Sequence, residues 1–302
     1  MKHFLSINDL KSDQLTFLIN KAIESKNSSQ LKFSNLAENR ILAMIFERPS
    51  TRTRLSFDVA MKHLGGSTIT MNQQEMHVGQ QKESIIDTAR TLSQYVDIIM
   101  LRSKAHSSLQ ELSSAATIPV INGLSDLSHP CQVMADLMTI FEKKNRFANI
   151  NIAWVGPITN VTHSWIEAVN LDLGINFGIY TDQSYILKHN EKCKKYNYHL
   201  NLDKVKIIKN INEFDSVDVV LTDTWESMGE NHNLEIFNNL KKYTVNQELM
   251  SLFKKDCIFM HCLPANRSQE VSNDVIDGPQ SVVWSEAENR LHIQKEIIKW
   301  CL

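Results

Sequence analysis

The sequence lacks the features that mark several large classes of protein. Its 302 residues hold no run of about 18 consecutive apolar residues, which excludes a transmembrane helix. The stretch Met1–Ser6 has no long apolar core of the kind that signal peptides carry, and the chain contains no short-period repeat or low-complexity tract. A formal net charge of −2 predicts no nucleic-acid or membrane-surface partner. We therefore expect a cytoplasmic protein.

Cysteine pairs and glycine fingerprints are also missing. The cysteines are odd in number, widely spaced and never in a CxxC pair, which argues against a disulfide framework and a zinc knuckle. Gly156 follows an apolar run but lacks the partner glycines of GxGxxG, which argues against a dinucleotide site. We therefore expect reduced thiols and neither a metal nor a cofactor. The cysteines are Cys131, Cys193, Cys257, Cys262 and Cys301.

What the chain does contain is an alternation of short apolar or β-branched runs with helical patterns. Such alternation is typical of parallel sheets covered by helices on both faces. At roughly 100–200 residues per domain, this length predicts two domains. Strands are predicted at residues 41–46, 68–71, 97–101, 119–121, 151–155, 177–180, 205–208, 217–222, 257–261 and 282–284. Helices are predicted at, among others, residues 84–95, 108–116, 132–143, 162–173, 246–253 and 286–302.

The polar stretch at residues 142–146 is the predicted boundary between the two domains. We expect residues 1–142 to form the first domain and residues 147–284 the second, with residues 285–302 forming a helix that returns to the first. The predicted fold is thus α/β, with two doubly wound parallel sheets and a cleft between the domains. Ligands of such sheets bind at the carboxyl ends of the strands.

The most informative stretch is Ser50-Thr51-Arg52-Thr53-Arg54, where the apolar run 41–46 gives way to a helical pattern. Pro49 fits a turn and Ser50 fits a helix N-cap. The unpaired N–H groups and the dipole at a helix N-terminus favour an anion, and hydroxyl and guanidinium donors suit phosphate in particular. An ordinary capped helix with solvated arginines is the alternative. Motifs further along the chain favour the phosphate interpretation.

Arg102, His129 and Gln132 extend this hypothesis within the first half of the chain. Arg102 ends the predicted strand 97–101, where ligand-facing side chains emerge in an open sheet. His129 and Gln132 are three residues apart at a helix start, so both face one point. Their imidazole and carboxamide complement the oxygen and nitrogen of a carbamoyl group. Taken alone, a surface arginine and a histidine before a proline-capped helix are the commoner explanations.

The second half of the chain carries candidates for binding an amino acid. Asp223 follows the predicted strand 217–222 and suits an ammonium group, while Ser227-Met228-Gly229 offers donors for a carboxylate. Asn160 lies in the turn after strand 151–155 and could bind a polar substrate group. Cys262, in His261-Cys262-Leu263-Pro264, either acts as a nucleophile or positions a substrate amine. Arg290 could reach back into the cleft.

These motifs, taken together and in this order, resemble the aspartate/ornithine carbamoyltransferase family. The likeness extends from about Leu36 to Arg290 and into the last helix. The motifs around Ser50 and His129 are similar to those of the whole family. The Ser-Met-Gly loop and the His-Cys-Leu-Pro motif are similar to the ornithine branch rather than the aspartate branch.

The resemblance implies a reaction and a role for each domain. The first domain would bind carbamoyl phosphate and the second L-ornithine, and transfer of the carbamoyl group to the δ-amine would give citrulline and phosphate. No metal or covalent intermediate is required, because the two substrates react directly. The acceptor could instead be N-acetylornithine, putrescine or aspartate, and a catalytically silent homologue or a nucleotide-binding oxidoreductase is the alternative from another class.

The resemblance also assigns roles to single residues. The implied ligands of carbamoyl phosphate are Ser50, Thr51, Arg52, Thr53, Arg102, His129, Gln132, Cys262, Leu263 and Arg290. The implied catalytic residues are Thr53, Arg102 and His129, which polarise the carbonyl, and Cys262, which lies beside the amine. The implied ligands of ornithine are Asn160, Asp223, Ser227 and Met228.

The family works as a trimer in which a loop of the neighbouring subunit completes each site. In this chain the corresponding segment is residues 76–84, where His77 stands in place of the usual glutamine and the stretch is one residue longer. We therefore expect a homotrimer, with His77 as the candidate for the contact with the neighbour.

Overall fold

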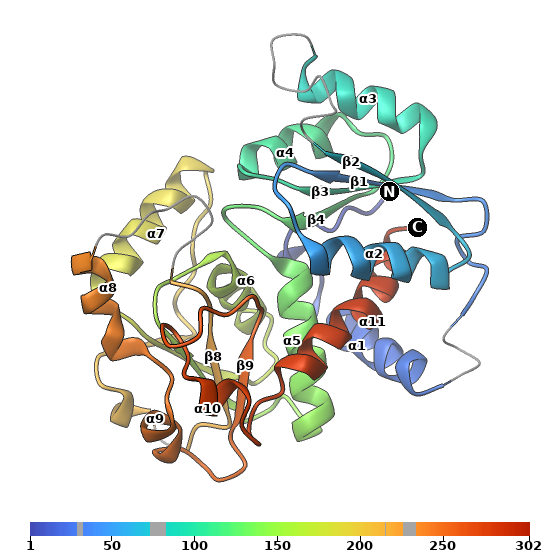
Figure 1. The fold of residues 1–302 in the computed structure, drawn as a ribbon. Helices are drawn as coiled ribbons and strands as arrows, with labels where there is room; N and C mark the ends of the chain where they lie inside the picture. The colour runs from blue at the N-terminus through green and yellow to red at the C-terminus, as the bar shows by residue number, and fades with distance from the viewer. Residues whose placement is uncertain (29–32, 73–82, 215, 226–233) are drawn as a thin grey trace. The chain divides into compact units, whose positions relative to one another are not determined.

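The computed structural model describes residues 1–28, 33–72, 83–214, 216–225 and 234–302, which form two compact units. Unit 1 consists of Met1–Met138 together with Glu288–Leu302, and unit 2 consists of Thr139–Ala287. Each unit is built around one parallel sheet with helices on its faces (Figure 1). The predicted fold class, two doubly wound α/β domains, is confirmed for each unit.

The sheet of unit 1 has four strands in the order β2-β1-β3-β4, and each neighbouring pair is parallel. Parallel neighbours need a crossover, and helices follow the strands as such crossovers do. The strands are β1 (Ile41–Phe46), β2 (Ser67–Asn72), β3 (Ile98–Arg102) and β4 (Val120–Leu124). The helices of this unit are η1 (Ile7–Asp9), α1 (Ser12–Asn27), α2 (Thr51–His63), α3 (Ile85–Tyr95), α4 (His106–Ala115), most of α5 (Pro130–Lys144) and most of α11 (Val283–Cys301).

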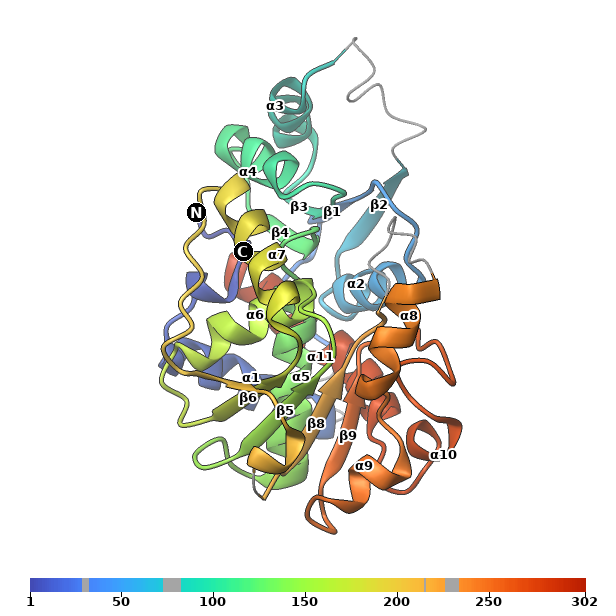
Figure 2. The ribbon, with the colours of Figure 1, turned by 90° about the vertical axis from the view of Figure 1, so that its left-hand side faces the viewer.

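Alternating side chains of β1 explain how both faces of this sheet become covered. Ala43 and Ile45 pack with buried residues of α3 and α4 in one apolar cluster. Because successive side chains of a strand point to opposite faces, Leu42 and Met44 point to the other face, and both are buried. Figures 1 and 2 show α3 and α4 on one side of the sheet and α2 on the other.

The sheet of unit 2 has five parallel strands in the order β7-β6-β5-β8-β9. On one face, Trp165 of α6 stacks on Phe177 of β6, with ring centroids 5.7 Å apart. On the other face, Val155 and Val220 pack in a cluster with Tyr243 and other buried residues. The strands are β5 (Asn151–Val155), β6 (Asn176–Tyr180), β7 (Val205–Ile208), β8 (Val219–Thr222) and β9 (Ile258–His261). The helices are α6 (Asn160–Val169), α7 (Gln183–Lys195), η3 (Ile211–Glu213), α8 (Leu234–Leu240), η4 (Lys241–Tyr243), α9 (Gln247–Ser251) and α10 (Asn273–Ile276).

The last helix, α11, joins the first unit again near the end of the chain. Lys26 of α1 donates a hydrogen bond of 2.7 Å to Asn289, and the ring of Trp300 meets Phe4 edge to face at 6.3 Å. A terminal helix that packs back on the first unit was predicted, and these contacts confirm it. Among the described residues, no helix is long and apolar enough to cross a membrane.

One predicted strand is wrong. Residues 282–284 do not form a strand, because Val283 already begins α11. Only a short parallel bridge, Phe259 to Ser281, runs beside β9, and the N–H of Val282 donates to the carbonyl of Phe259. The apolar run therefore serves as a helix start that is anchored to the edge of the sheet. The predicted helix 162–173 also begins earlier and ends earlier than expected, as α6.

Candidate active site

Four residues separate the end of β1 at Phe46 from the start of α2 at Thr51, as the sequence indicated. The hydroxyl of Ser50 caps the helix by accepting a hydrogen bond of 3.4 Å from the N–H of Thr53. Thr53 is buried and Arg52 half-buried, whereas Thr51 is exposed. The helix ends at His63, where Gly65 has a φ of 81°, a conformation that suits glycine. Hydroxyls and backbone N–H groups therefore meet at one helix start.

Two buried arginines converge on the hydroxyl of Thr53. Arg102, at the end of β3, donates to Thr53 Oγ1 at 3.5 Å, and Arg290 of α11 donates to the same oxygen at 3.4 Å. Both arginines are less than 5% exposed. Guanidinium groups gathered at a helix N-terminus create the positive potential and the donor geometry that a phosphate requires.

Gln132 joins the same network through its carboxamide. Its Oε1 accepts a hydrogen bond of 2.6 Å from Arg290, and its Nε2 donates to Asp136 at 2.8 Å. Gln294 holds Arg290 from the other side: with its amide oriented to satisfy both atoms, its oxygen accepts from Arg290 Nε at 3.0 Å. Sequence reasoning missed Asp136 and Gln294, although each lies four residues along the helix from a candidate, a spacing that places both on one face.

His129 lies just before α5, beside these arginines. Burial, together with the positive charges of Arg290, Arg102 and Arg52, holds the pKa of His129 well below its ordinary value. Its imidazole is therefore neutral at physiological pH and presents one N–H donor. The carbonyl of the same residue accepts from the N–H of Gln132, which fixes the loop at the helix start.

The candidates in unit 2 lie at the carboxyl ends of three adjacent strands. Thr222 of β8 pairs with His261 of β9, so the residues that follow them, Asp223 and Cys262, emerge side by side. The thiol of Cys262 donates to Asp223 Oδ1 at 3.1 Å, and that oxygen also accepts from the N–H of Thr224. Asp223 and Cys262 are both half-buried. A carboxylate in this position can receive an ammonium group.

Asn160 follows β5, the strand next to β8, and is half-buried. We predicted it in a turn, but it is the first residue of α6. Thr159 is the N-cap, and its hydroxyl accepts from the N–H of Val161 at 3.2 Å. The structure thus brings Asn160, Asp223 and Cys262 to the same edge of one sheet.

The turn after β9 is fixed by a buried histidine. His261 Nδ1 accepts from the N–H of Leu263 at 2.9 Å, so its proton lies on Nε2, which faces Glu270 Oε1 at 3.2 Å. Glu286 accepts from the N–H of His261. The Leu263 N–H is therefore committed to this bond. Glu270 and Glu286 are further residues that sequence reasoning missed, because no local pattern indicates them.

Two groups of described side chains lie close enough to suggest a metal site. One is Asp223, His261 and Cys262, but both ring nitrogens of His261 already have partners. The other lies on α6 and α7 and consists of His163, His189 and Cys193. All five cysteines are free thiols.

Three predicted site residues lie outside the described residues. They are His77, Ser227 and Met228. Their roles stay predictions.

Comparison with known proteins supports the interpretation of the site. Family models described as the carbamoyl-P binding domain and the Asp/Orn binding domain of aspartate/ornithine carbamoyltransferase match residues 2–142 and 148–301. A Mesorhizobium japonicum protein named ornithine carbamoyltransferase is 44% identical and spans 100% of this chain and 99% of its own length.

Solved structures agree with this finding. Ornithine carbamoyltransferase from Pyrococcus furiosus has a TM-score of 0.87 at 40% identity and covers 98% of this chain and 96% of its own. The anabolic ornithine carbamoyltransferase of Campylobacter jejuni has a TM-score of 0.85 at 32% identity and covers 100% and 99%. The chain therefore belongs to the aspartate/ornithine carbamoyltransferase family.

Proposed function

We propose that this chain transfers the carbamoyl group of carbamoyl phosphate to the δ-amine of L-ornithine, giving L-citrulline and phosphate. The observation that carries this proposal is the convergence of Arg102 and Arg290 on Thr53 at the N-terminus of α2. It is a site for a phosphorylated substrate in a chain whose full-length relatives are named ornithine carbamoyltransferase. The step belongs to arginine biosynthesis, in keeping with the anabolic relative.

The phosphate of the donor lies at the start of α2. Ser50, Thr51, Arg52 and Thr53 supply hydroxyl, guanidinium and backbone donors to it. Arg102 bridges the phosphate and the carbonyl oxygen, because its guanidinium offers several donors in a planar fork. Gln132, the Leu263 carbonyl and Arg290 fix the carbamoyl group, with Cys262 close by.

The acceptor lies against the strand ends of unit 2. The carboxylate of Asp223 receives the α-ammonium group of ornithine. Asn160, Ser227 and Met228 bind the same α-amino acid end of the substrate, which carries the α-carboxylate. Cys262 lies beside the side-chain amine. Its thiol donates to Asp223, which leaves the carboxylate with a full negative charge for the ammonium group.

The reaction needs no covalent intermediate. The neutral δ-amine of ornithine attacks the carbamoyl carbon, and the resulting tetrahedral oxyanion collapses with loss of phosphate, which takes up the proton that the attacking nitrogen releases. Thr53, Arg102 and His129 donate toward the oxygen where charge develops, and one such donor is worth about 3–4 kcal/mol. Holding both substrates in reacting geometry contributes roughly 7–11 kcal/mol. The amine must lose its proton first, so the rate should rise with pH.

We also propose the family's assembly and location for this chain. A homotrimer would place residues 76–84, including His77, against a neighbouring site. Light scattering on the purified protein tests this, and a mass other than a multiple of three chains would contradict it. The cytoplasm is the proposed location, in keeping with the substrates.

The experiment that tests the function is citrulline formation from carbamoyl phosphate with four amines offered separately. These are ornithine, N-acetylornithine, putrescine and aspartate. Product with ornithine alone is expected. Product with another amine would support the proposed phosphate site but show that the acceptor is an amine other than ornithine. The absence of carbamoyl transfer to any of them, from folded protein, would contradict the proposal.

A further inference from the structure

A buried cluster of two histidines and one cysteine lies in unit 2, away from the strand ends that carry Asp223 and Cys262. His163 is on α6, and His189 and Cys193 are four residues apart on α7, a spacing that places both on one helix face. His163 Nδ1 lies 2.9 Å from His189 Nε2 and 3.8 Å from Cys193 Sγ. Each of the three residues is less than 5% exposed. The cluster therefore points three ligand atoms at one spot inside the unit.

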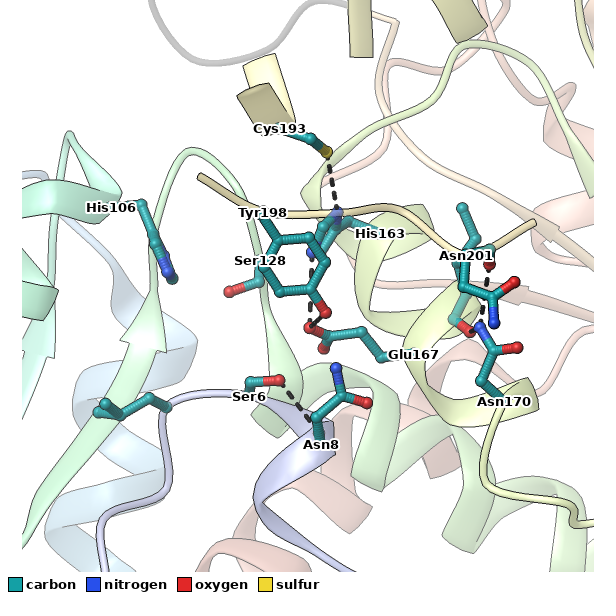
Figure 3. A network of polar contacts seen from close by, with 12 residues as sticks. Ser6, Asn8, His106, Ser128, His163, Glu167, Asn170, Cys193, Tyr198 and Asn201 are labelled. Carbon is teal, nitrogen blue, oxygen red and sulfur yellow. Dashed lines mark hydrogen bonds and ion pairs between the residues drawn. The ribbon is translucent and has the colours of Figure 1, made fainter. Parts of the chain in front are cut away.

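The imidazole of His163 faces a carboxylate on its other side, at ion-pair distance but without a hydrogen bond. Its Nε2 lies 3.5 Å from Glu167 Oε1, and the hydroxyl of Tyr198 donates to the same oxygen at 2.6 Å. Figure 3 shows Cys193 on one side of His163 and Glu167 with Tyr198 on the other. A proton on Nε2, facing Glu167, leaves the Nδ1 lone pair directed at Cys193 and His189. On ion binding, a small rotation of the ring would let Nε2 donate to Glu167, as metal-ligating histidines donate to carboxylates.

We propose that His163 Nδ1, His189 Nε2 and Cys193 Sγ bind one Zn²⁺ ion. Nitrogen and sulfur ligands suit Zn²⁺, and its bond lengths place tetrahedral ligand atoms roughly 3.3–3.6 Å apart. The separations of 2.9 Å and 3.8 Å lie on either side of that range, so small side-chain rotations bring all three atoms onto the ion.

Protons and charge balance when the ion binds. The thiol proton of Cys193 leaves to solvent, and the proton that His189 Nε2 shares with His163 moves to His189 Nδ1. Two positive charges then face the Cys193 thiolate and the Glu167 carboxylate, so the buried site is neutral overall. That neutrality matters because an uncompensated charge in a protein interior is costly.

The ion would link α6 to α7. Asn170, just after α6, already donates to the carbonyl of Asn201 at 3.0 Å, a second tie between this helix and the segment after α7 (Figure 3). Because Asn160 is the first residue of α6, the ion would hold in place the helix that presents this side chain. The Zn²⁺ site is independent of the proposed reaction and is tested without it.

The test is spectroscopic, on the full chain stripped of metal with a chelator. Titration with Co²⁺ should give one ion per chain, with d–d absorption of a tetrahedral site and a thiolate-to-cobalt charge-transfer band, and Zn²⁺ should displace it. Cys193→Ser should abolish the charge-transfer band. Cys262→Ser and Cys257→Ser are the matched controls, since they remove a half-buried and a buried thiol elsewhere, and both should keep the band.

Two further measurements keep the proposal falsifiable if Cys193→Ser does not fold. Glu167→Gln should keep the band and weaken Co²⁺ binding about 10–100-fold, as loss of a partner to a ligating histidine does. Zn²⁺ should also raise the melting temperature of the wild-type protein. The proposal is overturned if wild-type protein gives no charge-transfer band, or if the band is lost in Cys262→Ser and kept in Cys193→Ser. The cluster is then held by hydrogen bonds alone.

Discussion

The two units assemble their halves of the proposed active site in different ways. In unit 1, side chains from α2, β3, α5 and α11 meet in one buried hydrogen-bonded network centred on Thr53. In unit 2, Asn160, Asp223 and Cys262 are half-buried and lie side by side because their strands are neighbours in one sheet. The phosphate half thus depends on contacts between distant segments, whereas the ornithine half depends on strand order and register. Substitutions in each unit should show whether the two halves respond differently.

The largest effect is expected in the network of unit 1. Arg102→Ala removes a donor to the developing oxyanion, and loss of one such donor lowers kcat about 10²–10³-fold. Steady-state kinetics with both substrates varied would measure it. Arg146→Ala, at an exposed arginine, is the control and should retain full activity. A near-normal kcat in Arg102→Ala, with an unchanged melting temperature, would show that Arg102 is not part of the reacting site.

A smaller and selective effect is expected in unit 2. Asp223→Asn keeps an oxygen for the Cys262 thiol and removes the charge that receives an ammonium group. A hydrogen bond to a charged group is worth about 1.5–3 kcal/mol, which predicts a loss of roughly 10–100-fold in kcat/KM for ornithine. Asp203→Asn, at an exposed aspartate, is the control. If only the kcat/KM for carbamoyl phosphate falls, Asp223 does not belong to the ornithine site.

Arg52 and Arg54 offer a matched pair on one helix. Arg52 is half-buried and Arg54 exposed, so Arg52→Ala should raise the KM for carbamoyl phosphate about tenfold, while Arg54→Ala should change it less. The fold should be unaffected in both. Equal effects of the two substitutions would mean that general positive charge near α2, rather than a phosphate contact, is being measured.

The smallest effect concerns stability and pH. Because the pKa of His129 is lowered in the folded protein, the unfolded chain binds a proton below about pH 6.5 that the folded chain does not. Stability should therefore fall as the pH drops from about 6.5 toward the folded pKa. Between about pH 7 and pH 5.5, the free energy of unfolding should fall by about 1 kcal/mol more in the wild type than in His129→Gln.

Urea unfolding at the two pH values would measure this difference. His199→Gln, at an exposed histidine, controls for the loss of an imidazole. If His129→Gln and the wild type lose the same free energy on acidification, the neutral, arginine-flanked environment of His129 is contradicted.

Local sequence patterns predicted most of the features that depend on local sequence, namely strand bounds and a helix cap. The strands 41–46, 151–155 and 205–208 have the expected bounds, because short apolar runs between polar segments indicate buried parallel strands. The Ser50 cap was predicted for the same local reason. The strand at 282–284 was wrong because an apolar run at a helix start looks the same. The order β2-β1-β3-β4 depends on packing between segments far apart in sequence, which no local pattern encodes.

The candidate site likewise has features that local patterns predict and features that depend on packing between distant segments. Asp223 and Cys262 could be placed at strand ends from sequence, but their 3.1 Å contact follows from the pairing of β8 with β9. The residues that pattern reasoning missed, Gln294 and Glu270 among them, hold other site residues in place. Such supporting side chains have no motif of their own, since what they bind is set by the folded structure.

The position of Arg290 in the chain has a consequence for how the protein is made. It is 237 residues away from its partner Thr53, on α11, a helix that leaves the ribosome long after the strands of unit 1. A growing chain can form the sheet of unit 1 long before it can complete the phosphate half of the site. Binding of carbamoyl phosphate at full strength therefore requires synthesis to have passed Arg290, and chains that stop before it should neither hold the substrate tightly nor consume it.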